Sequence, residues 1–400
     1  MEQTAAPRKR EIWLDWMRVA ACLMVVVVHS AEPFYLGGDG SLVLTAAEGF
    51  WADFFDSLVR CCVPLFVVAS AWLQFPLHYS TGEFFRRRAV RILVPFAVWT
   101  LVYALVWGEP VQNLKDLLLN FNYAAGHLWF VYMLVGLYLL MPLLSPWAEK
   151  VSRRELQGYL GLWLLTTLIP YLRDALGGPL TFTYGPSGLP RQALYPLWGE
   201  ASWNAYGVFY YFSGFIGYLL LGLYLRRFLG ELSLRKTLAI AVPAYLLGFS
   251  LTFGGFLRRL AQSAGTTVKA LQDGAFPVSG PVDMAVWWET TWCNDTLGVV
   301  LMTLACILLF RKIKSEGRCY QKVVLPLSRA GYGMYLCHLL ILVPLSGAVR
   351  GSLGIGEDGQ LGLWTAAVEI LLSALGAFIL TACVSVLMQR IPKIGKYLMG

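Results

Sequence analysis

The sequence predicts an all-α polytopic membrane protein with about ten transmembrane helices and both termini in the cytosol. Its 400 residues are 57% hydrophobic and 14% charged, with a mean hydropathy of +0.59, whereas ordinary soluble domains are ~45–50% apolar and ~25% charged. Apolar windows of about 20 residues, the length that crosses a bilayer as a helix, recur from Trp13 almost to the C-terminus. This composition excludes a typical soluble globular protein.

The apolar windows also define the domain organisation. The longest gaps between them, near residues 173–203 and 258–286, are too short to form an independent folded core. We therefore expect a single membrane domain over residues 1–400, without a separate soluble domain. The predicted spans, in chain order, cover residues 12–34, 52–75, 89–107, 128–148, 156–176, 204–225, 236–257, 287–310, 330–349 and 364–389.

The basic residues predict the orientation of these spans. With ten spans, 23 of the 32 Lys and Arg residues lie on the side of the termini and seven on the opposite side. Cytosolic loops carry this excess of positive charge, so both termini are expected in the cytosol. The predicted location is the plasma membrane, most simply a bacterial inner membrane. Asp15 and Arg18 interrupt the first apolar run, which argues against a cleaved signal peptide there.

The charge and the cysteines exclude several other classes. The net charge of +8 follows the membrane topology and forms no contiguous basic element, so we expect no nucleic-acid partner. Cysteines such as Cys22, Cys62, Cys306, Cys337 and Cys383 lie within apolar windows, and no CxxC or Cys/His ligand spacing is present. The sequence therefore predicts neither a disulfide framework nor a metal site.

The first span carries ionisable residues on one helix face. Asp15, Arg18 and His29 are 3 and 11 positions apart, and eleven steps of 100° bring His29 back to within about 20° of Arg18. The two side chains are ~16 Å apart along the axis, with Arg18 near the cytosolic surface. Because charges at membrane depth are costly, such residues are functional candidates. The polar face is expected to line a bundle interior or a wet cavity.

Each of these residues also has a structural interpretation. Asp15 and Arg18 match an interfacial ion pair as well as a catalytic pair. His29 matches either a buried histidine with satisfied hydrogen bonds or a general base, because a neutral imidazole accepts a proton from a hydroxyl near pH 7. Glu32, one turn further on, is placed either to orient the His29 ring or to lie exposed in a loop.

Two further groups of charges lie in the second and third spans. Asp53, Asp56 and Arg60 fall at i, i+3 and i+7, which favours a structural ion cluster over catalysis. Arg88 and Arg91 enter the third span from the cytosol after Arg86 and Arg87. Positive-inside anchoring explains the first two arginines, whereas Arg88 and Arg91 also suit the phosphate groups of a cytosolic cofactor.

Polar and aromatic residues of later spans are candidates for substrate binding. His127 precedes Trp129 at the outer mouth of the fourth span, where an interfacial anchor is the alternative. His338 and Tyr335 lie within the ninth span, where His338 also matches a buried structural hydrogen bond. Asp295, like Glu289, enters the eighth span from outside, with acceptor binding and structural pairing left open. These candidates for contact with substrate are His127, Trp129, Asp295, Tyr335 and His338.

An ordered set of motifs resembles the acyltransferase 3 family of integral membrane acyltransferases. Arg18 and His29, separated by ten residues, resemble its first-span signature, and Arg88-Ala89-Val90-Arg91 resembles its RxxR motif. The remaining segments that agree, in chain order, are Val63-Pro64-Leu65-Phe66 with Ser70, His127-Leu128-Trp129-Phe130, Ser328 through Tyr332, and Tyr335-Leu336-Cys337-His338. Ala71 stands where many members have glycine. The resemblance spans nearly the whole chain, and the surface-polysaccharide or common-antigen branch is the most similar.

The resemblance implies a function and a site. Members move acyl groups, commonly acetyl, from cytosolic acyl-CoA to hydroxyls of extracytoplasmic glycans, lipid-linked sugars or other small acceptors. It makes His29 the expected catalytic base and Arg18 its functional partner, with Asp15 and Glu32 beside them. It places Arg88 and Arg91 at the donor, acetyl-CoA or another acyl-CoA. The oligomeric state is not predicted, and membrane lipid is the other expected partner.

A transporter or flippase of a lipid-linked sugar is the alternative class. It would use the polar face of the first span as a translocation path and His29 as a proton-coupling site. No internal sequence repeat of the kind common in transporters is visible, which favours the enzyme.

Overall fold

The computed structural model describes residues 10–34, 46–119, 123–175, 206–263, 291–353 and 364–400. These residues form helices joined by short turns, and no strand occurs among them. The helices of the first half are α1 (Ile12–Ala31), α2 (Ala46–Val59), α3 (Cys62–Gln74), α4 (Thr81–Arg88), α5 (Val94–Val106), α6 (Pro110–Leu119), α7 (Trp129–Lys150) and α8 (Arg153–Ala175). Those of the second half are α9 (Ile216–Arg227), α10 (Leu234–Ser263), α13 (Leu297–Phe310), α14 (Leu325–Ser352), α15 (Thr365–Gln389) and α16 (Gly395–Met399).

The length and composition of the helices confirm a polytopic membrane protein. Seven helical segments of the described chain are long and apolar enough to cross a bilayer. The other three predicted spans correspond to α8, to the short α9 and to α13, which has 14 residues. Ten spans therefore stay a prediction. The seven segments are Ile12–Phe34, Gly49–Gln74, Thr81–Val106, Ala125–Lys150, Leu234–Arg258, Tyr320–Ser352 and Thr365–Gln389.

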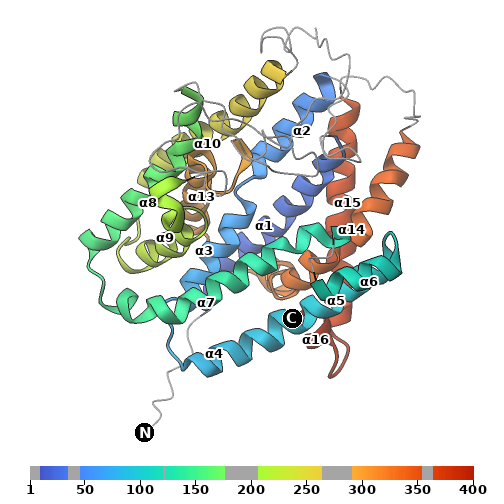
Figure 1. Cartoon of the computed structure of the whole chain (residues 1–400), viewed down its shortest axis with the longest axis horizontal. Coiled ribbons are helices and arrows are strands. Elements are labelled where there is room, and N and C mark those ends of the chain that lie inside the picture. Colours follow the sequence, from blue (N-terminus) through green and yellow to red (C-terminus); the bar gives the residue numbers. More distant parts are fainter. Residues whose placement is uncertain (1–9, 35–45, 120–122, 176–205, 264–290, 354–363) are drawn as a thin grey trace.

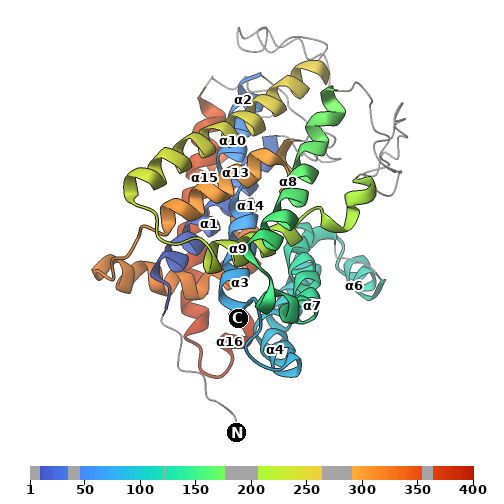
Figure 2. The same cartoon turned by 90° about the vertical axis from the view of Figure 1, so that its left-hand side faces the viewer.

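Helix α1 is the central element of the bundle. It contacts α2, α3, α13, α14 and α15, and it lies between the α2–α3 pair and the α14–α15 pair (Figure 1). Helices α10 and α13 lie side by side (Figure 2), because Gly248 and Gly298 let the two backbones approach closely. A β-carbon at Gly248 would lie 2.4 Å from the Gly298 carbonyl oxygen. With neighbours on every side, the polar face of α1 is held inside the protein.

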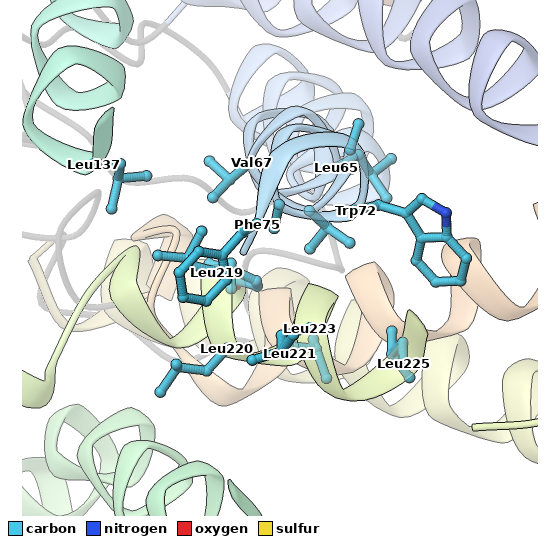
Figure 3. Close-up of a cluster of buried hydrophobic side chains, with 14 of the residues drawn as sticks. Leu65, Val67, Trp72, Phe75, Leu137, Leu219, Leu220, Leu221, Leu223 and Leu225 are labelled. Atoms are coloured by element: carbon cyan, nitrogen blue, oxygen red, sulfur yellow. The ribbon is translucent and has the colours of Figure 1, made fainter. Parts of the chain in front are cut away.

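Helix α9 packs against α3 through leucines and a glycine. Leu219 and Leu223 of α9 lie beside Leu65 and Phe75 of the α3 segment in the main hydrophobic cluster (Figure 3). At Gly222, an added β-carbon would lie 2.7 Å from the β-carbon of Ala71 on α3. The close approach of these helices therefore depends on a glycine in α9, facing the alanine of α3.

Three prolines shape the helices around α1. Pro64 has no N–H to bond the carbonyl of Arg60, and the predicted span 52–75 is in fact two helices, separated at Arg60 and Cys61. Two π-helical turns, η2 (Ala89–Leu93) and η6 (Tyr320–Val324), precede helices with Pro95 and Pro326 in their first turn. Proline removes an intrahelical donor, and π turns are frequent at functional sites.

Candidate active site

A cavity of about 770 Å³ extends along the polar face of α1. Arg18 and His29 both line it, so its extent along α1 is at least ~16 Å. This confirms that the two residues share one face and that the face lines a cavity. The remaining walls come from α3, α7, α14, α16 and the α4–η2 segment. Lining residues from these elements include Ser70, Gln74, Arg88, Arg91, Trp129, Phe130, Ser328, Arg329, Tyr332, Tyr335, Lys396 and Gly400.

One end of the cavity brings together three of the four histidines of the chain. The ring centroids of His29 and His338 are 4.9 Å apart, those of His127 and His338 are 5.1 Å apart, and those of His29 and His127 are 6.3 Å apart. His29 and His127 line the cavity, and His338 is 1% exposed behind them. The three residues come from α1, the 3-10 turn η3 (Tyr123–Leu128) and α14.

Contacts between nitrogen and oxygen orient two of these rings. His29 Nδ1 lies 2.7 Å from the Glu32 carboxylate, and His338 Nδ1 lies 2.6 Å from the Tyr335 carbonyl oxygen. The Tyr335 carbonyl is an acceptor, so Nδ1 of His338 carries a proton, and the Glu32 carboxylate favours a proton on Nδ1 of His29. Glu32 lies in the turn η1 (Glu32–Phe34) directly after α1, and it orients the His29 ring. The predicted His29–Glu32 contact is thus present in the structure.

His127 is buried, and it does not serve as an interfacial anchor. Its residue is 6% exposed, and its ring packs edge to face on Tyr103 at 4.8 Å between centroids. The Tyr335 hydroxyl donates to the His127 backbone carbonyl at 2.7 Å. Trp129 and Phe130 follow at the start of α7 and line the same cavity. His127 and His338, predicted from two separate spans, therefore lie against His29; Tyr335 contacts both of these rings, and Trp129 lines the same cavity.

The other end of the cavity is cationic. Arg18 and Arg91 line it together with Arg88, whose guanidinium lies over the rings of Phe84 and Tyr138. Arg329 of α14 and Lys396 of α16 complete the group. Within the described chain none of these five side chains forms an ion pair. Cations that line one cavity without an ion-pair partner make its electrostatic potential positive, which attracts anions.

The π turn η2 and the helix α16 hold Arg91 at this opening. The Tyr332 hydroxyl donates to the Ile92 carbonyl at 2.9 Å, and the Trp99 indole donates to the Leu398 carbonyl at 2.8 Å. An added β-carbon at Gly400 would lie 2.8 Å from the Arg91 carbonyl oxygen. Residues near the start of α14, in η2, in α5 and in α16 thus form one packed wall.

Asp15 lies outside this cavity lining and pairs with a different arginine from the one predicted. Its carboxylate accepts from Arg10 at 2.6 and 2.9 Å, from Tyr320 at 2.8 Å and from Ser328 at 2.6 Å. The predicted Asp15–Arg18 ion pair is therefore absent, because Arg10 and η6 occupy the carboxylate. The same contact raises the pKa of Arg10, which lies outside the apolar span. Asp15 is also ~21 Å along α1 from His29, which favours a structural role.

Replacing Asp15 with asparagine should therefore lower the stability of the fold and have little effect on the rate of acyl transfer. The variant loses the charge that holds Arg10, Tyr320 and Ser328, and we expect about 1–2 kcal/mol less stability, because Arg10 is partly exposed. Thermal unfolding in detergent measures the change. Asp116→Asn on the exposed helix α6 is the matched control and should change stability by less than about 0.5 kcal/mol. A normal melting temperature combined with lost turnover in Asp15→Asn would contradict this assignment.

The second group of acidic residues lies apart from the cavity. Arg60 donates to Asp56 at 2.8 Å and to the Trp292 carbonyl at 2.8 Å, and Ser57 donates to Asp53 at 2.7 Å. This confirms the expected i, i+4 pair. Asp295 does not line the cavity; it accepts from the Tyr206 hydroxyl at 2.5 Å. Glu289 lies outside the described residues.

Several site residues were not predicted from sequence. In the sequence, Arg329 and Lys396 are visible only as part of the cytosolic excess of positive charge. This excess does not distinguish a residue that lines a cavity from one that anchors a helix at the membrane surface. Ser70 and Gln74 of α3 also line the cavity, as polar residues in an apolar span. Among the described residues no group of His, Cys, Asp and Glu is arranged to hold a metal ion.

The fold and the site together define a helical membrane protein in which one cavity is lined both by several basic residues and by His29, whose ring contacts Glu32. The acyltransferase 3 family model, described as an acyltransferase domain, matches residues 11–390. The chain belongs to this family and is an integral membrane acyltransferase. No curated protein and no solved structure matches it.

Proposed function

We propose that this protein transfers an acyl group, most simply acetyl, from cytosolic acyl-CoA to a hydroxyl of an extracytoplasmic glycan or lipid-linked sugar. One observation carries the proposal: a single cavity is lined by five cations that form no ion pair within the described residues and by His29, whose ring contacts Glu32. A donor with phosphates at one end and a thioester at the other matches this distribution of charge.

The cationic end supports binding of the donor phosphates. Arg88 and Arg91 are expected there, and Arg18, Arg329 and Lys396 line the same cavity. Guanidinium groups bind phosphate oxygens through paired N–H donors. Between the two ends the walls are largely apolar and aromatic, which suits a pantetheine arm. These wall residues include Val25, Val63, Phe66, Phe130, Leu134 and Tyr138.

The histidine end supports general base catalysis. His29 Nδ1 faces the Glu32 carboxylate at 2.7 Å. In the proposed mechanism Nδ1 therefore carries the proton of the neutral ring, and the lone pair on Nε2 takes the proton of the acceptor. The acceptor hydroxyl gives its proton to His29 Nε2, and its oxygen attacks the thioester carbonyl carbon. Glu32 stabilises the imidazolium that forms, as the orienting carboxylate does in other acid–base pairs. The family assignment gives no support to the transporter alternative.

The proposed topology places the cationic end of the cavity in the cytosol. Cys319, an exposed cysteine, lies in the basic segment before η6 and should be cytosolic together with both termini. A membrane-impermeant maleimide is expected to label Cys319 in inverted inner-membrane vesicles and not in right-side-out vesicles, and Cys319→Ser should remove the label. Labelling from outside would overturn the orientation, and with it the direction of transfer.

Transfer of isotope-labelled acetyl tests the function. Purified protein in lipid vesicles receives labelled acetyl-CoA and a panel of free monosaccharides and lipid-linked sugars. We expect label in at least one acceptor, together with release of free CoA thiol. Protein that binds no acetyl-CoA, and no longer-chain acyl-CoA, would contradict the proposal. Binding without transfer to any of these acceptors would reject the sugar panel as acceptors.

A further inference from the structure

The cavity wall beside His29 contains an imidazole that the mechanism above leaves unused. His127 lines the cavity and is 6% exposed. Neither of its ring nitrogens forms a hydrogen bond of good geometry within the described residues, and the Leu336 carbonyl beside the ring accepts from the Tyr103 hydroxyl at 3.0 Å. In every protonation state a histidine ring carries at least one N–H, and a buried donor without a partner is costly to the fold. A ligand in the cavity that accepts a hydrogen bond from this N–H would explain why the ring lies at the cavity edge without a protein partner.

The three imidazoles differ in the partners of their ring nitrogens. His29 Nδ1 lies 2.7 Å from the Glu32 carboxylate, and His338 Nδ1 contacts the Tyr335 carbonyl oxygen at 2.6 Å. Each of these two rings therefore has one nitrogen facing an oxygen. Within this cluster, His127 is the ring of which both nitrogens lack a hydrogen bond among the described residues. Acyl transfer needs both a base and a hydrogen-bond donor for the carbonyl oxygen, and His127 can supply the donor.

The His127 ring is held in place on several sides. It packs edge to face on Tyr103 and on His338, at 4.8 and 5.1 Å between centroids. Tyr335 fixes its backbone carbonyl by a hydrogen bond of 2.7 Å, and Tyr335 is bonded in turn to the His338 ring through its own carbonyl. A donor fixed before the reaction stabilises developing charge without reorganisation in the transition state.

We propose that His127 donates a hydrogen bond to the thioester carbonyl oxygen and stabilises the oxyanion, an inference that rests on the proposed function. The acceptor oxygen forms a bond to the carbonyl carbon while its proton passes to His29 Nε2. The C=O π electrons move onto the oxygen that faces the His127 N–H. Collapse of this intermediate restores C=O, breaks the C–S bond and releases the CoA thiolate, which takes the proton from His29.

The carbonyl stretch of bound donor tests the contact without requiring an acceptor. Acetyl-CoA labelled with ¹³C at the thioester carbonyl is bound to protein in lipid vesicles, and isotope-edited infrared difference spectra are recorded. We expect a shift to lower frequency relative to free acetyl-CoA in the wild type. In His127→Phe, which keeps a flat ring without a donor, the shift should be lost while the Kd for acetyl-CoA changes less than about threefold.

Kinetics then separate a catalytic donor from a residue that only shapes the wall. With the acceptor found by the transfer assay, or with water as acceptor, His127→Phe should lower kcat roughly 100-fold and leave KM for acetyl-CoA near the wild-type value. Asn and Gln each replace the ring by an amide N–H, near the position of Nδ1 and of Nε2 respectively. One of the two should recover part of kcat and of the infrared shift, which identifies the donating nitrogen.

The outcomes distinguish this inference from the function on which it rests. Wild type that does not bind acetyl-CoA overturns both. Wild type that transfers acetyl but shows no carbonyl shift, or a His127→Phe variant with normal shift and kcat, overturns the inference alone. If His127→Phe fails to fold, judged by its melting temperature, the Asn and Gln variants decide: wild-type kcat and an unchanged shift in both overturn the inference, and a shift and kcat that change together support it.

Discussion

Replacing His29 with alanine is expected to lower acyl transfer roughly 1,000-fold or more while the protein remains folded and binds donor. A positioned general base contributes about 10²- to 10⁴-fold, and in the cavity His29 is the imidazole whose Nδ1 is held by a carboxylate at 2.7 Å. Alanine removes the Nε2 lone pair that takes the hydroxyl proton. The measurement is transfer of labelled acetyl by purified wild type and variant, together with the Kd for acetyl-CoA.

Two further variants sharpen this prediction. Glu32→Gln keeps the size of the side chain but removes the charge that stabilises the imidazolium, so we expect an intermediate loss in kcat. His78→Ala is the matched control, because His78 is the fourth histidine of the chain, is exposed and does not line the cavity. It should transfer acetyl at the wild-type rate. Turnover within about threefold of wild type in His29→Ala would reject His29 as the base.

The double substitution Arg88→Gln/Arg91→Gln should weaken acetyl-CoA binding by a factor of roughly a thousand. Each charge-assisted hydrogen bond to a phosphate contributes about 1.5–3 kcal/mol, and both arginines line the cationic end of the cavity. The Kd for acetyl-CoA is measured by isothermal titration at two salt concentrations. Wild-type affinity should fall with salt, and the variant should show a weaker dependence because fewer cations contact the donor.

The neighbouring arginines provide the control for charge alone. Arg86→Gln/Arg87→Gln removes the same number of charges from the same helix, but neither residue lines the cavity and Arg87 pairs with Glu83. Its Kd should stay within about threefold of wild type. Acetyl-pantetheine, which lacks the donor phosphates, should be used equally well by wild type and by Arg88→Gln/Arg91→Gln. Equal losses in both double variants would indicate a general electrostatic effect and no donor site.

The first span shows how far the sequence predicts the site. The positions of Arg18 and His29 imply one helix face, and the structure confirms that this face lines a cavity. The RxxR pair at Arg88 and Arg91 was likewise predicted to lie beside the same site. Helical periodicity relates residues within one helix, so the shared face of Arg18 and His29 follows from spacing, whereas the place of Arg88 and Arg91 beside it was implied by the family resemblance.

Contacts between residues of different helices were harder to predict from the sequence. Asp15 and Arg18 have the spacing of an ion pair, but Arg10, Tyr320 and Ser328 satisfy the carboxylate instead. Spacing along the sequence predicts which residues share a helix face. It does not predict which residues from other segments pack against that face. The break at Arg60 and Cys61 and the π turn around Arg91 also depart from regular periodicity, in each case shortly before a proline.

By itself the sequence determined the class of the protein and its helical membrane architecture, and it predicted His29, Arg18, Arg88 and Arg91 as site residues, because hydropathy, helical periodicity and the family motifs are local properties. Only the tertiary structure decided that His127 and His338 lie against His29, and that Arg329 and Lys396 join the cationic end. These contacts join residues that are far apart along the chain. They arise when α1, α14, α16 and η3 pack around one cavity, and packing between helices is a property of the whole bundle.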